Sequence, residues 1–304
     1  MNIRIYPILL AVLVFSGLSH DSYADVGNCP ITDSKVALDS GILYYRQAGA
    51  GPHILLLHGL FANKEQWNDL LCLLSAAGYT AIAPDLPGYG QSLQFPITDY
   101  PLEKQVARLR QFMGTLGIAH FDLAGSSMGG TIAALYVRRY PRQVRTLAFI
   151  GSPLGIVDWN PRFKEAIHQG VNPLIPIDSS QFDLEMSLLF FKPPPIPESH
   201  KVGMVQNYLE RNRHYQQVWD IVNLYDNALA DGPTMQIPTL ILWGVGDGIF
   251  AVEGMDRLRY RFPHGKRVRL PDTGHLPQLE NPKVTAGIYL DFLNQHPAGR
   301  RRGR

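Results

Sequence analysis

One serine of this chain lies in a glycine-flanked turn that is typical of catalytic nucleophiles. Residues 125–129 read Gly-Ser-Ser-Met-Gly and place Ser127 between Gly125 and Gly129. A strand-like segment precedes the turn, and apolar residues at i, i+4, i+7 and i+8 follow it, as on one face of a helix. Such a turn exposes the hydroxyl at the positive end of the helix, and a Cβ at either glycine would collide with neighbouring backbone. We predict a nucleophile at Ser127; the alternative is a serine that only caps the helix.

A nucleophilic serine needs a base to accept its proton and an acid to orient that base. After turns of this kind the acid and the histidine follow in that order, each at the end of a later strand. Asp247 follows the continuous apolar run 238–244, which suits a strand buried on both faces, and His275 follows a short strand predicted at 267–270. We predict that His275 is the general base and acid, and that Asp247 orients its ring and stabilises the imidazolium.

Two other aspartates are alternatives for the acid. Asp272 lies only three residues before His275, so that reaching its ring would require an awkward local turn. Asp158 follows the strand predicted at 146–150 and would supply the acid from the preceding strand instead. Asp247 is preferred over both, and the alternative for His275 is an ordinary histidine of a surface loop.

Two backbone N–H groups are expected to bind the oxyanion of the tetrahedral intermediate, because such donors need no reorganisation. One is the N–H of Met128, directly after the serine. The other belongs to the loop that reads His-Gly-Leu-Phe from His58, where we predict Leu60, with Phe61 as the alternative. His58 is interpreted as a residue that holds this loop by hydrogen bonds, and not as the base.

The remaining pattern predicts one α/β domain. A chain of 304 residues with 45% hydrophobic composition is long enough for a substantial core. Its alternating strand and helix signals fit a doubly wound, mostly parallel sheet with helices on both faces.

With these residues in place, the chain resembles the α/β-hydrolase family along nearly all of its mature length. The resemblance implies that fold, a Ser-His-Asp triad and an acyl-enzyme, and the serine disfavours relatives with an aspartate nucleophile. Residues 85–92 are interpreted as a structural turn after a strand. The matching segments are 58–59, 85–92, 125–130, 243–247 and 274–282.

A narrower likeness concerns residues 58–67, 174–176 and 247–254, which look most like monoacylglycerol lipases and related small bacterial lipases. It implies hydrolysis of monoacylglycerols or similar single-chain lipid esters. The alternatives are a short-chain carboxylesterase, a carbon–carbon bond hydrolase or a perhydrolase on the same triad, because fold does not set the substrate. A binding protein without catalysis is the remaining alternative.

A long segment between the strands predicted at 146–150 and 238–244 is expected to form a helical lid or cap. The predicted organisation is a hydrolase core at 25–155 and 236–296, with the lid at 156–235. Helical patches are expected at 182–191 and 215–229, interrupted by a run of three prolines at 193–195.

The lid carries a concentrated apolar patch that offers two interpretations. It either packs on the body of the domain, or it forms the wall of an acyl-chain pocket or a surface that contacts lipid. The residues predicted to line the substrate pocket are Phe61, Leu188, Phe190 and Phe191.

Both ends of the chain are expected to lie outside the fold. Residues 1–24 predict a signal peptide with cleavage after Ala24, and hence a secreted or periplasmic protein; an uncleaved anchor is the alternative. The tail, 297–304, carries four arginines, whereas the whole chain has a net charge of +2, so the rest of the chain has a net charge of 2 − 4 = −2. A nucleic-acid partner is therefore not supported. A solvated terminus is expected there, with contact to anionic lipid as the alternative.

The two cysteines leave two interpretations open. Export would allow a disulfide between Cys29 and Cys72, whereas the apolar surroundings of Cys72 equally suit a buried free thiol. Histidines and cysteines show no metal-ligand spacing, and no phosphate-binding glycine loop is found. We expect no metal, no cofactor, a small lipid or ester as the partner, and a monomer.

Overall fold

The structure is a computed structural model that describes residues 29–155, 159–225, 228–229 and 232–298. The predicted signal peptide, the alternative acid Asp158 and the arginines of the tail lie outside the described residues.

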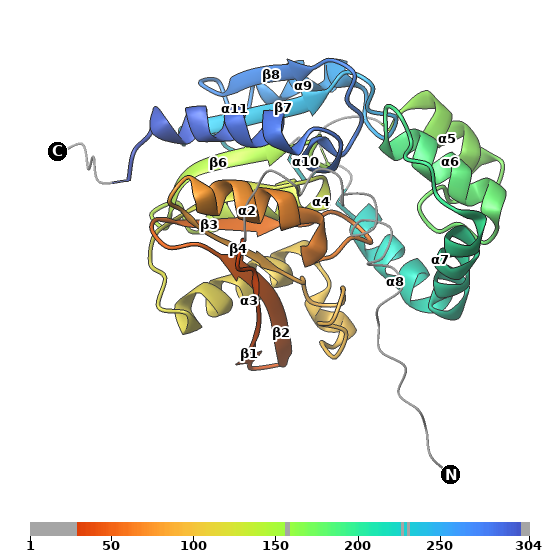
Figure 1. The fold of residues 1–304 in the computed structure, drawn as a ribbon, viewed down its shortest axis with the longest axis horizontal. Helices are drawn as coiled ribbons and strands as arrows, with labels where there is room; N and C mark the ends of the chain where they lie inside the picture. The colour runs from red at the N-terminus through yellow and green to blue at the C-terminus, as the bar shows by residue number, and fades with distance from the viewer. Residues whose placement is uncertain (1–28, 156–158, 226–227, 230–231, 299–304) are drawn as a thin grey trace, which may run out of the picture.

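An eight-stranded sheet with the order β1-β2-β4-β3-β5-β6-β7-β8 forms the centre of the molecule (Figure 1). The first two strands form an antiparallel hairpin, β2 pairs with β4 in antiparallel fashion, and the remaining neighbours are parallel. The predicted mostly parallel sheet is therefore confirmed. The strands are β1 (Thr32–Leu38), β2 (Gly41–Ala48), β3 (His53–Leu57), β4 (Thr80–Pro84), β5 (Phe121–Gly125), β6 (Val144–Ile150), β7 (Thr239–Gly244) and β8 (Lys266–Leu270).

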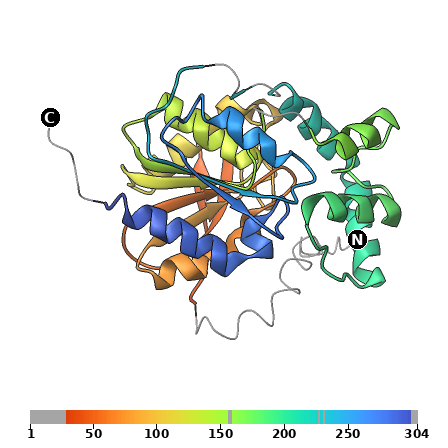
Figure 2. The ribbon, with the colours of Figure 1, turned by 90° about the horizontal axis from the view of Figure 1, so that it is seen from above.

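Helices cover both faces of the sheet, as seen from above in Figure 2. The central strands are apolar at successive positions because each face meets its own helices. In β3, Leu55 and Leu57 belong to one core cluster, and Ile54 and Leu56 belong to the other. The first cluster includes residues of α3 (Leu102–Thr115), α4 (Met128–Arg139) and α9 (Met255–Leu258), and the second includes residues of α2 (Asn68–Ala76) and α11 (Pro282–Asn294). Short helices lie at Lys64–Trp67, Ile97–Asp99, Val252–Gly254 and Pro277–Glu280.

Four helices follow β6 before the chain returns as β7: α5 (Pro161–His168), α6 (Ser179–Leu189), α7 (Glu198–Glu210) and α8 (Asn212–Asn223). Figure 1 shows them together on the side toward which the strands point. The helices predicted at 182–191 and 215–229 exist with shifted ends. Asp178 caps α6 by accepting a hydrogen bond from the N–H of Gln181, which explains the earlier start. We call the segment that carries these four helices, residues 156–235, the insertion. Its role as a lid stays a prediction.

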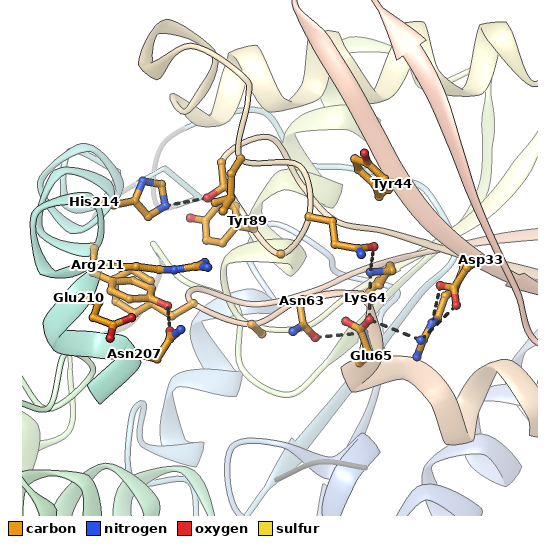
Figure 3. A pocket seen from close by; sticks show the side chains of 18 of the residues that line it. Asp33, Tyr44, Asn63, Lys64, Glu65, Tyr89, Asn207, Glu210, Arg211 and His214 are labelled. Atoms are coloured by element: carbon orange, nitrogen blue, oxygen red, sulfur yellow. Dashed lines mark hydrogen bonds and ion pairs between the residues drawn. The ribbon is translucent and has the colours of Figure 1, made fainter. Parts of the chain in front are cut away.

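A polar groove of about 880 Å³ separates the β1–β2 hairpin from α7 and α8 (Figure 3). Its floor holds a buried ion-pair cluster in which Lys64 Nζ lies 2.9 Å from a carboxylate oxygen of both Asp85 and Glu65. The N–H of Gln91 also donates to Asp85. Asp85 and Gln91 belong to the 85–92 turn, which agrees with the structural role expected of that segment.

The structure joins Cys29 and Cys72 in a disulfide, and thereby decides between the two interpretations of these residues. The bond ties the start of the described chain to α2 across a sequence separation of 43 residues. Within the described ranges, none of the helices has the length and hydrophobicity that crossing a membrane requires.

Candidate active site

Ser127 occupies the tight connection between β5 and α4. Its backbone has a φ of 52° and a ψ of −122°, a conformation that is costly for a residue with a side chain. A Cβ on Gly125 would lie 2.3 Å from the carbonyl carbon of Gly129, and one on Gly129 would lie 2.3 Å from the oxygen of Leu57. The prediction that both glycines are required by close backbone approach is therefore confirmed.

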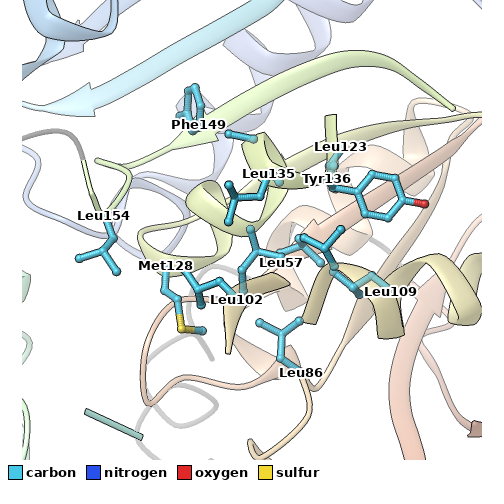
Figure 4. Packing of buried hydrophobic residues seen from close by; sticks show 14 of the residues in the cluster. Leu57, Leu86, Leu102, Leu109, Leu123, Met128, Leu135, Tyr136, Phe149 and Leu154 are labelled. Carbon is cyan, nitrogen blue, oxygen red and sulfur yellow. The ribbon is translucent and has the colours of Figure 1, made fainter. Parts of the chain in front are cut away.

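The helix that begins at Met128 is buried more completely than its pattern predicts. The sequence indicates one apolar face, but every residue from Met128 to Val137 is buried. The helix lies against β5 and β6 on one side and α3 on the other, and its small residues allow this close packing. Figure 4 shows Met128 and Leu135 among side chains from the sheet and from α3. The packing holds the turn at Ser127 rigidly.

Asp247 and His275 meet at the carboxyl ends of β7 and β8. The Nδ1 of His275 lies 2.9 Å from Oδ2 of Asp247, and both side chains are nearly inaccessible to solvent. The other carboxylate oxygen accepts hydrogen bonds from the N–H groups of Ile249 (2.9 Å) and Phe250 (3.0 Å). With Nδ1 facing the carboxylate, the ring is oriented so that Nε2 is the nitrogen left for chemistry.

The structure adds Ser152, which the sequence analysis missed. Its hydroxyl donates to Oδ2 of Asp247 at 2.6 Å, and its oxygen lies 3.0 Å from Nδ1 of His275. Ser152 is fully buried and comes two residues after β6, at the same edge of the sheet as the other two residues. The only signal in the sequence was this position after a predicted strand.

Of the two alternative aspartates, only Asp272 lies within the described residues. Asp272 is exposed and has a positive φ of 49°, and the Nδ1 of His275 faces Asp247 instead. Asp158 lies outside the described residues.

His58 holds the loop that approaches Ser127. The N–H of Leu86 donates to Nε2 of His58 at 3.0 Å, so Nδ1 carries the proton and donates to the carbonyl of Gly59 at 2.8 Å. Burial lowers the pKa of His58 to about 4, although the bond to Gly59 raises it. These contacts agree with the loop-holding role expected of His58, which is neutral and fully engaged at neutral pH.

The loop brings its backbone against the serine. A Cβ on Gly59 would lie 3.3 Å from Cβ of Ser127, so only a glycine allows this approach without displacement. Leu60 and Phe61 follow and line the same cavity as Ser127 and Met128. Phe61 has a φ of 57°, which is strained for an aromatic residue and turns the chain sharply at this point.

Ser127 and His275 open into one small cavity of about 90 Å³. Its walls come from the loop after β3 and from the insertion, chiefly α6 and α7. The apolar side chains among the lining residues are Leu60, Phe61, Ala62, Met128, Leu154, Trp159, Leu174, Phe182, Met186, Leu189, Met204, Ile249, Leu276 and Leu279.

Of the four residues predicted to line the substrate pocket, Phe61 lines this cavity, whereas Leu188, Phe190 and Phe191 do not. The helix α6 turns positions 182, 185, 186 and 189 toward the cavity, which is the i, i+3, i+4, i+7 face. Leu188 therefore lies in the main core.

The other two residues follow the end of α6. Phe190 has extended backbone and packs in a cluster with Phe182 and Met204. Phe191 is 51% exposed and its ring lies close to Gly246.

In the part of the chain that the structure describes, no group of three or more histidine, cysteine or acidic side chains is placed to hold a metal ion.

The sequence pattern that describes the alpha/beta hydrolase family matches residues 54–288. The chain belongs to this family. Its mostly parallel eight-stranded sheet with helices on both faces is the alpha/beta hydrolase fold.

The relatives include bacterial and mammalian lipases. The chain is 29% identical to Lipase 1 of Psychrobacter immobilis over 247 residues, which cover 80% of this chain and 77% of that protein. It is 30% identical to the monoacylglycerol lipase ABHD6 of Mus musculus over 81% of this chain and 76% of the relative. Among solved structures, a bacterial membrane phospholipase A superimposes with a TM-score of 0.81 at 28% identity, covering 95% of this chain and 93% of that one.

Proposed function

We propose that this chain is a serine hydrolase that cleaves monoacylglycerols or similar single-chain lipid esters. The observation that carries the proposal is the contact of His275 with Asp247 beside a cavity that Ser127 also lines. The family and the lipase relatives support a carboxylic ester hydrolase. The choice of lipid ester is our proposal.

The proposed reaction begins with attack of Ser127 Oγ on the ester carbonyl, while His275 Nε2 accepts the hydroxyl proton. The N–H groups of Leu60 and Met128 bind the oxyanion. The carbon–oxygen bond then breaks, and His275 gives its proton to the departing alcohol. Water repeats the sequence on the acyl-enzyme and releases the carboxylic acid. Throughout, Asp247 keeps the ring oriented and stabilises its positive charge.

The insertion, residues 156–235, is proposed as a lid over this cavity that contacts a lipid surface. Two of its helices contribute to the cavity wall. It also carries six of the ten exposed large hydrophobic side chains of the described residues, which is more than its share of the chain. These six are Ile167, Ile177, Phe191, Val202, Leu209 and Leu224. Residues 1–24 are proposed as an export signal, which would place the enzyme in the periplasm or outside the cell.

A second candidate is a short-chain carboxylesterase. The volume of about 90 Å³ favours it, because a medium or long acyl chain needs more room than the cavity offers with the insertion in this position.

The test is hydrolysis of p-nitrophenyl esters and monoacylglycerols, from acetyl to palmitoyl, by the purified mature protein with Ser127→Ala as the control. A rate maximum at medium or long chains that the substitution abolishes supports the lipase. A maximum at acetyl or butyryl supports the short-chain esterase instead. Near-normal turnover by Ser127→Ala would refute the assignment of the nucleophile.

A further inference from the structure

Two buried polar side chains interrupt the apolar wall of the cavity that Ser127 and His275 share. Gln66, from the short helix Lys64–Trp67, is 3% exposed, and Glu185, from α6, is 4% exposed. Neither side chain takes part in the proposed reaction.

Each of the two side chains has one atom with a partner and one without. Oε1 of Gln66 accepts a long hydrogen bond of 3.5 Å from the N–H of Gly59, and Oε1 of Glu185 accepts one of 2.9 Å from the hydroxyl of Tyr208. Nε2 of Gln66 and Oε2 of Glu185 have no partner. Seven buried side-chain atoms of the described residues share this condition, and these two belong to residues that line the cavity. Because a buried polar atom without a partner is costly, two in one cavity indicate a ligand that pairs with them.

The chemistry of the two atoms selects a hydroxyl. The amide of Gln66 offers an N–H donor. Burial raises the pKa of Glu185 to about 8, although the bond from Tyr208 lowers it, so that at neutral pH the carboxyl is mostly protonated and both donates and accepts. A hydroxyl can accept a hydrogen bond from Nε2 of Gln66, and it can either donate to Glu185 or accept from it. An anionic group would lack a cation, and an alkyl group would leave both atoms unpaired.

The position of Glu185 indicates which part of the ester carries that hydroxyl. The backbone N–H of His275 donates to the carbonyl of Leu189 at 2.8 Å, so the end of α6 lies beside the histidine. Glu185 is one helical turn earlier on α6. Since His275 delivers its proton to the departing oxygen, the alcohol portion lies on this side of Ser127.

We infer that Gln66 and Glu185 form a polar subsite that binds free hydroxyl groups on the alcohol portion of the substrate. The subsite rests on the proposed function and deepens it. It makes a polyol ester such as a monoacylglycerol a better substrate than an alkyl ester with the same acyl chain. A site built to bind a hydroxyl discriminates strongly against the analogue that lacks it.

The test compares kcat/KM for a 1-monoacylglycerol and for the propyl ester of the same acid, which is the same molecule without its two free hydroxyls. Wild type should prefer the monoacylglycerol. Glu185→Leu should lose about tenfold or more on the monoacylglycerol and little on the propyl ester. Gln66→Leu also removes the acceptor of the Gly59 N–H and should lower both rates, but its loss should be about tenfold larger on the monoacylglycerol. Glu185→Gln, which keeps a donor and an acceptor, should retain most of the preference.

Gln105→Leu is the matched control, because Gln105 is also buried with an unpaired amide oxygen but does not line the cavity. It should affect both substrates alike. An equal loss on both substrates in the Gln66 and Glu185 variants, or no preference in wild type, would overturn the subsite while Ser127-dependent turnover left the proposed function standing. The absence of Ser127-dependent turnover on either ester would overturn both.

Discussion

At the scale of single residues, the site combines a strained serine with tightly held neighbouring side chains. Ser127 keeps its positive φ because Gly125 and Gly129 allow the surrounding backbone to close around it. Asp247 accepts four hydrogen bonds, from Ser152, His275 and two backbone N–H groups, so a buried carboxylate is well compensated. Precise positioning of this kind is what a proton-transfer step requires.

Ser152→Ala should lower kcat by about tenfold to a hundredfold, with KM little changed. The hydroxyl donates to the charged Asp247, and hydrogen bonds to charged groups contribute about 1.5–3 kcal/mol. Steady-state kinetics on a soluble ester measure the effect. Ser187→Ala is the control, since its hydroxyl donates to the carbonyl of Leu184 on α6. Unchanged kcat in Ser152→Ala would mean that the hydroxyl plays no part in positioning the acid.

Glu185 should make the stability of the fold fall as the pH rises. Its pKa is raised from 4.5 to about 8, so between these values the folded state holds a proton that the unfolded state releases. The stabilisation is complete below about pH 4.5 and is lost as the pH approaches about 8, with each pKa unit corresponding to about 1.4 kcal/mol. Melting temperatures of wild type and Glu185→Gln from pH 5 to pH 8 measure it as a difference curve. Parallel curves for the two proteins would contradict this prediction.

At the scale of elements, the loop between β3 and the short helix at Lys64–Trp67 depends on a contact with the β4 side of the sheet. His58 joins the two by accepting from Leu86 and donating to Gly59. The neutral form of His58 is required, because its Nε2 must accept the hydrogen bond from Leu86. Burial favours this form by lowering the pKa of His58 to about 4. The stability that this form contributes is complete above about pH 6.5 and is lost as the pH falls toward about 4.

His58→Ala should destabilise the protein by about 1–3 kcal/mol, because the buried N–H of Leu86 loses its acceptor. It should also lower kcat, since Gly59 and Leu60 would no longer be held against Ser127. Chemical denaturation and kinetics measure both effects. His58→Gln serves as the comparison, because an amide can replace part of the hydrogen bonding. A variant with full stability and full kcat would show that the loop holds its position without His58.

At the scale of the whole molecule, the sheet and the helical insertion make different contributions to the site. The sheet places Ser127, Asp247 and His275 at the ends of three different strands, whereas the insertion supplies much of the cavity wall and most of the exposed apolar side chains. Loops and insertions at the carboxyl ends of parallel strands are the usual place for a binding site. Substrate selection and contact with lipid therefore belong to the insertion in our proposal.

Val202→Ser should weaken activity on emulsified or vesicle-bound substrate while activity on a dissolved short ester stays unchanged. Val202 is 55% exposed on α7, and an apolar side chain there gains by entering a lipid surface. Val284→Ser is the matched control, because Val284 is 52% exposed but lies on α11, away from the insertion. Equal effects of the two substitutions on vesicle sedimentation and on activity would contradict a lipid-binding role for this face.

The sequence by itself determined the fold class, the turn at Ser127 and the loop-holding role of His58. These features depend on local patterns: a strand followed by two glycines and a helix can close in few ways, and continuous apolar runs require burial on both faces. The same reasoning put Asp247 and His275 at the ends of neighbouring strands, where the structure brings them into contact.

Only the tertiary structure decided which side chains meet across the insertion. The apolar run at Leu188–Phe191 does not reveal how α6 is rotated about its axis, and the packing of α6 on the core turns Glu185 and Met186 to the cavity instead. Ser152 and the Cys29–Cys72 disulfide were likewise fixed by approaches between segments far apart in the chain. Periodicity records which residues are apolar, but the partner that each face meets is set by packing of the whole molecule.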